Sequence, residues 1–271
     1  MTTAAEHQLA AGDPAGALAL LQAEVRREPA NVKLRIFLFQ LLCVLGQWSR
    51  AATQLEVCAG MDAATLAMAS TYREALKCEL VREAVFAGRT TPMVLGQPQA
   101  WVAWLVEALA ADARGDAAAA HRLRAHAFDT APASAGAANG ERFEWVADAD
   151  SRLGPVLEAI VNGRYCWLPF SALAQLTLDV PEDLRDFVWA PAHLTFTNGG
   201  DAVALVPTRY PLPEAEHSGA ELMARSTSWR ELGADQYAGC GERVLTTSST
   251  ELGLLAVREL RIDAAPETPA A

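Results

Sequence analysis

The chain has 271 residues, of which 51% are hydrophobic and 20% are charged, and its formal net charge is −11. This balance is typical of a globular protein with a sizeable core, and it excludes a disordered chain. Every apolar run is far shorter than the roughly 20 residues that a membrane-spanning helix needs. The first residues lack the basic and apolar regions of a secretory signal. We therefore expect a cytoplasmic protein without membrane insertion.

The negative charge is concentrated in the second half of the chain. Residues 1–139 carry 12 Lys and Arg against 13 Asp and Glu, whereas residues 140–271 carry 10 against 20. Such an acidic half repels phosphate backbones, so we expect no nucleic-acid partner. The five cysteines are scattered, without a CxxC pair, which argues against a zinc site and a disulfide framework.

A repeat is visible in the first half. The pattern G-[DQ]-x-x-x-A begins at Gly12, Gly46 and Gly115. The first two copies are 34 residues apart, which is the tetratricopeptide period, and the third lies 69 residues further on, close to two more periods. Glycine allows one helix to end and the chain to turn back. We therefore predict stacked helical hairpins of tetratricopeptide type.

Apolar residues at helical spacing support this prediction. Leu34, Leu38, Leu41 and Leu45 share one helix face, and residues 63–86 form one long predicted helix. A further stripe contains Trp101 and Trp104. The favoured interpretation of these tryptophans is helix packing, and contact with a partner is the alternative.

The segment 131–140, APASAGAANG, has the composition of a linker. The change in net charge falls at the same place. We therefore predict a helical domain over residues 1–139 and a small α+β domain over residues 140–271. The predicted fold class is a helical-hairpin superhelix followed by an α+β domain with antiparallel hairpins.

The second half contains several short predicted elements. After a strand over 143–146, Asp148 and Asp150 are expected to cap a short helix that carries Leu157, Ile160 and Val161 and ends at Gly163. The further expected elements are helical turns over 171–176 and 181–186, strands over 187–190 and 193–197, a hairpin turn at 198–199 with a return strand over 201–206, a short helix over 219–225, and a final hairpin of 244–247 with 254–262.

Few patterns indicate chemistry. A metal-dependent hydrolase could use Asp148 and Asp150, but Arg152 replaces the residue that a phosphatase loop requires, so helix capping is favoured. The Gly239-Cys240-Gly241 stretch lacks the third glycine of a dinucleotide loop and is predicted to be a turn. The histidines show no metal-ligand spacing. We expect no catalytic residues, no cofactor, no metal and no small-molecule substrate.

Arg209 lies between two prolines after a predicted strand, where an ion pair or a backbone hydrogen bond within the acidic half is the simplest role. The candidate partner-binding residues are aromatic residues of both halves and this arginine with its neighbour: Trp101, Trp104, Trp145, Arg209 and Tyr210.

Several blocks of the second half resemble the ImpE family, also called TagJ. They are DADSRLGPVLE (148–158), GRYCWLPF (163–170), VWAPA (188–192), VPTRYP (206–211), TSW (227–229) and GCGER (239–243). The resemblance implies two domains and a non-enzymatic cytoplasmic adaptor of bacterial type VI secretion. Such an adaptor would bind a helix of the small sheath subunit and link the contractile sheath to its disassembly ATPase. A generic repeat scaffold for another complex is the main alternative, and the hydrolase is a remote one.

Overall fold

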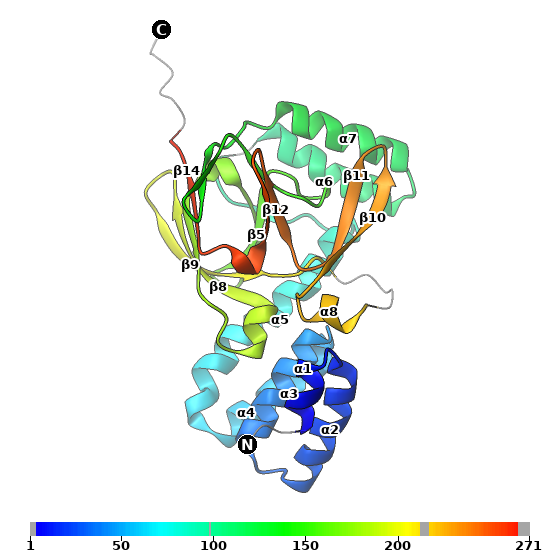
Figure 1. The fold of residues 1–271 in the computed structure, drawn as a ribbon, viewed down its shortest axis with the longest axis vertical. Coiled ribbons are helices and arrows are strands. Elements are labelled where there is room, and N and C mark those ends of the chain that lie inside the picture. Colours follow the sequence, from blue (N-terminus) through cyan, green and yellow to red (C-terminus); the bar gives the residue numbers. More distant parts are fainter. Residues whose placement is uncertain (1–3, 98, 212–216, 265–271) are drawn as a thin grey trace.

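The computed structural model describes residues 4–97, 99–211 and 217–264. The chain begins with five consecutive helices, each packed against the next. They are α1 (Ala4–Ala10), α2 (Pro14–Arg27), α3 (Val32–Val44), α4 (Trp48–Met61) and α5 (Leu66–Phe86), with the 3-10 turn η1 (Ala63–Thr65) before α5. In Figure 1, α1–α4 lie at the lower end of the molecule, and α5 extends from them to the β-rich part.

Local sequence explains where these helices begin and end. The Asp13 side chain accepts a hydrogen bond from the backbone N–H of Gly16, and the Asn31 side chain caps α3 in the same way. Gly12 and Gly46 have φ angles of 85° and 66°, a conformation that glycine adopts without steric cost. These turns confirm the predicted helical hairpins.

The rest of the chain is mainly β structure. A nine-stranded sheet has the order β1-β6-β5-β9-β8-β7-β14-β2-β3, and every neighbouring pair in it is antiparallel except β1 with β6. Its strands are β1 (Met93–Val94), β2 (Gly136–Ala138), β3 (Glu141–Phe143), β5 (Val156–Val161), β6 (Arg164–Pro169), β7 (Leu173–Leu178), β8 (Trp189–Phe196), β9 (Asp201–Pro207) and β14 (Glu259–Ile262).

Two smaller sheets complete the β-rich part. One has the order β13-β12-β4, and the other is the hairpin β10–β11. Their strands are β4 (Val146–Asp148), β12 (Val244–Thr247), β13 (Glu251–Gly253), β10 (Thr227–Gly233) and β11 (Gln236–Gly241), and the short helices nearby are η2 (Phe170–Ala172), η3 (Leu184–Phe187), α8 (Gly219–Leu222) and η4 (Leu254–Ala256). The predicted class, a helical repeat region followed by a domain with antiparallel sheets, is confirmed.

The helical hairpin of α6 (Ala100–Ala113) and α7 (Ala117–Thr130) lies apart from α1–α4. Figure 1 shows it at the opposite end of the molecule, beside β10 and β11. Gly115, with a φ of 78°, makes the expected turn between the two helices. The Arg124 side chain donates to Gln236 of β11 at 2.5 Å. The third copy of the repeat pattern therefore forms a hairpin that packs on the β-rich part.

The hairpin of β5 and β6 separates two hydrophobic cores. Val156, Ile160 and Trp167 belong to a core shared with the N-terminal helices, whereas Leu157 and Leu168 belong to a core inside the β-rich part. Successive side chains of a strand point to opposite faces of a sheet, so this hairpin contacts both cores. The helix-side core crosses the predicted boundary at residue 139, and that boundary stays a prediction.

Several predicted elements of the second half are wrong. The expected helix with Leu157, Ile160 and Val161 is strand β5, because all six of its residues are buried between the two cores. A strand that is buried on both faces does not show the alternation of a half-exposed strand. Asp148 and Asp150 therefore cap no helix.

Other corrections concern element type and strand pairing. The predicted linker contains strand β2, and the predicted turn Gly239–Gly241 lies in strand β11. The predicted helical turn at 171–176 is the 3-10 turn η2 followed by strand β7. β12 pairs with β4 and β13, whereas β14 pairs with β7 and β2, so the predicted final hairpin does not form. The hairpin of β8 and β9 through residues 197–200 is confirmed.

Candidate functional site

A buried ionic network joins the repeat helices to the β-rich part. Arg82 of α5 donates to both carboxylate oxygens of Glu158 on β5, at 2.7 and 2.9 Å, and to Glu79 at 3.4 Å. Tyr165 of β6 also donates to Glu158. Burial disfavours the charged form of Glu158, but the adjacent arginines outweigh it and lower its pKa to about 2. Glu158 is therefore a buried anion at neutral pH.

The same network continues to the small sheet. Arg243 is fully buried, donates to Asp148 at 2.7 and 2.9 Å, and lies 3.5 Å from Glu158. Tyr210 donates to the other Asp148 oxygen at 2.9 Å. Burial is the largest influence on Asp148, and it raises the pKa of that carboxyl to about 6 despite the adjacent Arg243.

Arg209 connects the β-rich part to the end of α3. Its guanidinium donates to the carbonyl oxygens of Val44 and Cys43, at 2.6 and 3.2 Å, and to that of Leu222. A cation at the C-terminal end of a helix is favoured by the unpaired carbonyls there. Burial lowers the pKa of Arg209 to about 10, so it keeps its charge at neutral pH. The expected backbone hydrogen bonds exist, but they reach across to the helical half.

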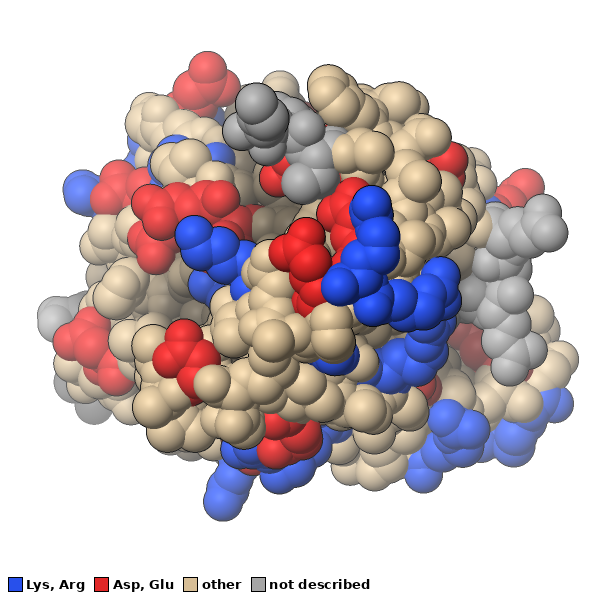
Figure 2. Space-filling view, turned by 90° about the horizontal axis from the view of Figure 1, so that it is seen from below, with Lys and Arg blue, Asp and Glu red and all other residues tan. Residues whose placement is uncertain are grey.

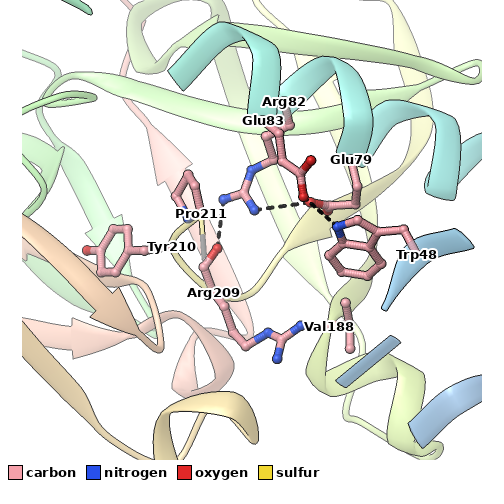
Figure 3. A pocket seen from close by; sticks show the side chains of 8 residues that line it. All are labelled: Trp48, Glu79, Arg82, Glu83, Val188, Arg209, Tyr210 and Pro211. Atoms are coloured by element: carbon pink, nitrogen blue, oxygen red, sulfur yellow. Dashed lines mark hydrogen bonds and ion pairs between the residues drawn. The ribbon is translucent and has the colours of Figure 1, made fainter. Parts of the chain in front are cut away.

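Figure 3 shows the small hollow at the centre of this junction. Arg82 also donates to the backbone oxygen of Arg209 at 2.7 Å, and Trp48 donates from its indole nitrogen to Glu83 at 2.7 Å. The indole nitrogen of Trp189 donates to Glu79 at 2.7 Å. These indoles pair with carboxylates in the C-terminal part of α5, so polar contacts fix that part of the helix.

The two aspartates proposed for metal-dependent hydrolysis are held by arginines. Arg152 donates to both oxygens of Asp150, at 2.5 to 3.1 Å, and Asp150 is 0% exposed. Asp148 is occupied by Arg243 and Tyr210, as described above. The two carboxylates also accept backbone N–H groups from the loop after β4, at 2.8 and 2.9 Å. This arrangement fixes the loop. The carboxylate oxygens that would bind a metal ion are paired with arginine side chains.

The predicted partner-binding residues lie in different environments. Arg209, Tyr210 and Trp101 are at most 3% exposed. Trp104 is half-buried, with its ring 3.9 Å from that of His126. Trp145 is 41% exposed, and it lines an apolar hollow of about 370 Å³ with Phe128. Arg209, Tyr210 and Trp101 are therefore buried within this chain, and partner contact stays a prediction for all five residues.

A second surface groove lies between α4 and α5. Its volume is about 220 Å³, and its lining includes Ala52, Leu55, Leu76 and Leu80. Exposed ion pairs flank it, one of them between Arg73 and Glu56 at 2.7 Å. Figure 2 views the end of the molecule where the N-terminal helices lie, and both signs of charge occur on that face. The groove therefore combines an apolar floor with a mixed-charge rim.

The fold and these surfaces define the class: a tetratricopeptide-type helical region fixed to an antiparallel β-rich domain. The family model described as ImpE protein matches residues 140–261, and a tetratricopeptide repeat model matches residues 8–70. The chain belongs to the ImpE family.

Relatives agree with this assignment. The chain is 50% identical over 256 residues to the type VI secretion system accessory component TagJ of Pseudomonas aeruginosa, which covers 94% of this chain and 90% of that protein. A crystal structure of a Vibrio parahaemolyticus protein is similar in fold, with a TM-score of 0.89 and 24% identity, over 96% of this chain and 98% of that one. None of the described helices combines the length and hydropathy needed to cross a membrane.

Reasoning from sequence missed the centre of the network. Arg82 and Glu158 are 76 residues apart, and no local pattern pairs them. One signal was available, because Glu158 is the single charged residue in the run from Val156 to Val161. A charge inside an otherwise apolar buried strand requires a buried partner.

Proposed function

We propose that this protein is a non-enzymatic cytoplasmic accessory component of a type VI secretion system. It binds a helix of the small subunit of the contractile sheath and links the sheath to its disassembly ATPase. The name of the Pseudomonas aeruginosa relative supports the secretion assignment. The sheath and ATPase partners are what membership of the ImpE family implies. The network of arginines and carboxylates supports a structural role for the most polar part of the interior.

The groove between α4 and α5 is the feature that supports binding of a helix. Its floor is apolar, and Leu80 at its edge is 54% exposed. An amphipathic helix binds such a groove through apolar residues at i, i+3 or i+4 and i+7. Residues 1–139 are nearly neutral, with 12 basic and 13 acidic residues, so apolar burial dominates the binding energy.

A peptide titration against the full chain tests this mode. The probe is a labelled peptide of the N-terminal helix of the small sheath subunit, and its Kd is measured by fluorescence anisotropy. Leu80→Glu should weaken binding about 10- to 100-fold, because it removes the roughly 1.5–3 kcal/mol gained on burying a leucine. Since Leu80 is exposed, the variant should fold normally.

The matched control is Val203→Glu on β9, which places the same charge at a residue that is 68% exposed. It should leave the Kd unchanged. Raising the salt concentration should change the wild-type Kd little, because screening acts on exposed charges. Equal Kd values for wild type and Leu80→Glu would contradict binding in the groove. If the peptide bound neither protein, the sheath subunit would not be the partner.

A further inference from the structure

Three residues from two segments of the chain meet at the surface between α8 and β11. The Nδ1 of His217 lies 2.9 Å from the Sγ of Cys240, and a carboxylate oxygen of Glu221 lies within 4.8 Å of both atoms. All three residues are half-buried. Among the residues that the structure describes, this is the one group of three such side chains close enough to share an ion.

The three donors are an imidazole, a thiol and a carboxylate. Zn²⁺ accepts all of them, at about 2.0–2.1 Å for nitrogen, 2.3 Å for sulfur and 2.0–2.2 Å for oxygen. A mixed nitrogen and sulfur set disfavours Mg²⁺ and Ca²⁺, which prefer oxygen. A tetrahedral ion would hold Nδ1 and Sγ about 3.5 Å apart, so the two side chains would separate by about half an ångström.

The surroundings position the carboxylate as they do in metal sites. Glu221 accepts hydrogen bonds from the backbone N–H of Ser218 at 2.8 Å and from the hydroxyl of Ser228 at 2.5 Å. Second contacts of this kind fix the orientation of metal-binding side chains. Ser218 and Glu221 form a reciprocal capping box on α8, so Glu221 has one defined rotamer before any ion binds.

The site also lies where the two halves of the protein meet. Gly219 of α8 approaches the first repeat turn so closely that an added Cβ would lie 1.9 Å from the carbonyl oxygen of Gly12. Arg225, just after α8, donates to the carbonyl of Leu9 at 3.4 Å. An ion held by α8 and β11 would therefore join a strand of the β-rich part to a helix that rests on the repeat.

We propose that His217, Glu221 and Cys240 form a binding site for a zinc-class divalent cation, which clamps α8 to β11 at this junction. On binding, the thiol of Cys240 loses its proton to solvent and the sulfur coordinates the ion, with no change of oxidation state. The fourth position is open to water. The site is independent of the partner proposed above. The sequence did not predict this metal site, because Cys240 and His217 are 23 residues apart and form no ligand-like spacing.

Co²⁺ and Zn²⁺ titrations of the full, chelator-treated chain test the site. Co²⁺ should produce a thiolate-to-metal charge-transfer band with one ion per chain, and Zn²⁺ should abolish the band by competition. Zn²⁺ should also raise the thermal unfolding midpoint, because a ligand that binds only the folded state stabilises it. Cys240→Ala should remove the band, and His217→Gln should weaken Zn²⁺ binding more than about 100-fold, beyond the 10–100-fold of a second contact.

Glu221→Gln keeps the capping geometry and removes the anionic ligand, so it should weaken Zn²⁺ binding without unfolding α8. His193→Gln, an exposed histidine of β8, is the matched control and should change nothing. The absence of a band in the wild type, or a band that survives Cys240→Ala, would overturn the site. Zn²⁺ binding without a rise in the unfolding midpoint would overturn the clamp.

Discussion

The two faces of the β5–β6 hairpin are stabilised in different ways. The face toward the repeat helices carries Glu158 and Tyr165 among apolar residues. Glu158 pairs with Arg82 and Arg243 and accepts a hydrogen bond from Tyr165. The opposite face carries Leu157, Ala159, Val161, Cys166 and Leu168, packed inside the β-rich part. One strand thus contributes an ion to one core and only apolar side chains to the other.

This difference indicates what each core specifies. Apolar packing is non-directional and tolerates rearrangement if volume is kept. A buried carboxylate needs its arginines at defined positions, because an unpaired buried charge costs several kcal/mol. We infer that the ionic face fixes the orientation of α5 on the sheet, whereas the apolar face supplies general stability.

The largest effect is expected for Arg243→Met. This change leaves Asp148 without its ion pair and removes a neighbour of Glu158, both of which are fully buried side chains. Removing one partner of a buried ion pair costs about 3–5 kcal/mol of unfolding free energy. Chemical denaturation, monitored by tryptophan fluorescence, measures the loss.

Arg261→Met is the matched control, because the ion pair of Arg261 with Glu259 is exposed at the surface. It should cost about 0–1 kcal/mol. Similar losses for the two variants would show that the network contributes no more than a surface pair, and the proposed contrast between the two faces would fail.

The sequence predicted the repeat helices well and the sheet poorly, for physical reasons. The turns at Gly12 and Gly46 depend on local conformation and recur at a fixed spacing, so they are visible in the sequence. Strand β5 is buried on both faces and shows no alternation, so its apolar residues resembled a helix stripe. The hairpin β10–β11 was missed altogether, although residues 234–235 form its turn with positive φ angles.

The candidate sites depended on contacts between distant residues. Arg209 was recognised as unusual, but its carbonyl partners are about 165 residues away in α3. Glu221 follows His217 by four residues, but Cys240 is 23 residues away, and only the packing of α8 on β11 brings the thiol to the other two groups. Pairings of this kind are set by the tertiary fold, which periodicity and spacing do not encode.

A smaller effect is expected from the pH dependence of Asp148. Its pKa is about 6 in the folded protein and 3.8 ordinarily, so the folded state binds its proton more tightly. The resulting stabilisation is complete below pH 3.8 and is lost as the pH rises through 6. Between pH 5 and 7 this one group should remove roughly 1 kcal/mol of unfolding free energy.

Asp148→Asn isolates this contribution, because the variant retains the shape of the side chain and cannot titrate. The difference in unfolding free energy between wild type and variant should narrow by that amount from pH 5 to pH 7. Glu158 does not interfere, since its folded pKa of about 2 confines its own loss of stability to pH values below 4.5. A difference that stays constant across this range would mean that Asp148 is already ionised at pH 5.

The smallest effect is expected on the apolar face, for Leu157→Met. Leu157 is 0% exposed and belongs to the core of the β-rich part, so the swap conserves volume and leaves no charge unpaired. Volume-conserving swaps of this kind cost less than about 1.5 kcal/mol, and we expect about 1 kcal/mol or less here.

Glu158→Met, at the next residue of the same strand, is the comparison, because it leaves Arg82 and Arg243 buried without their shared carboxylate. Denaturant titration should place that loss well above the loss for Leu157→Met. If the two adjacent substitutions lowered the unfolding free energy equally, the ionic and apolar faces of β5 would not differ in their contribution to stability.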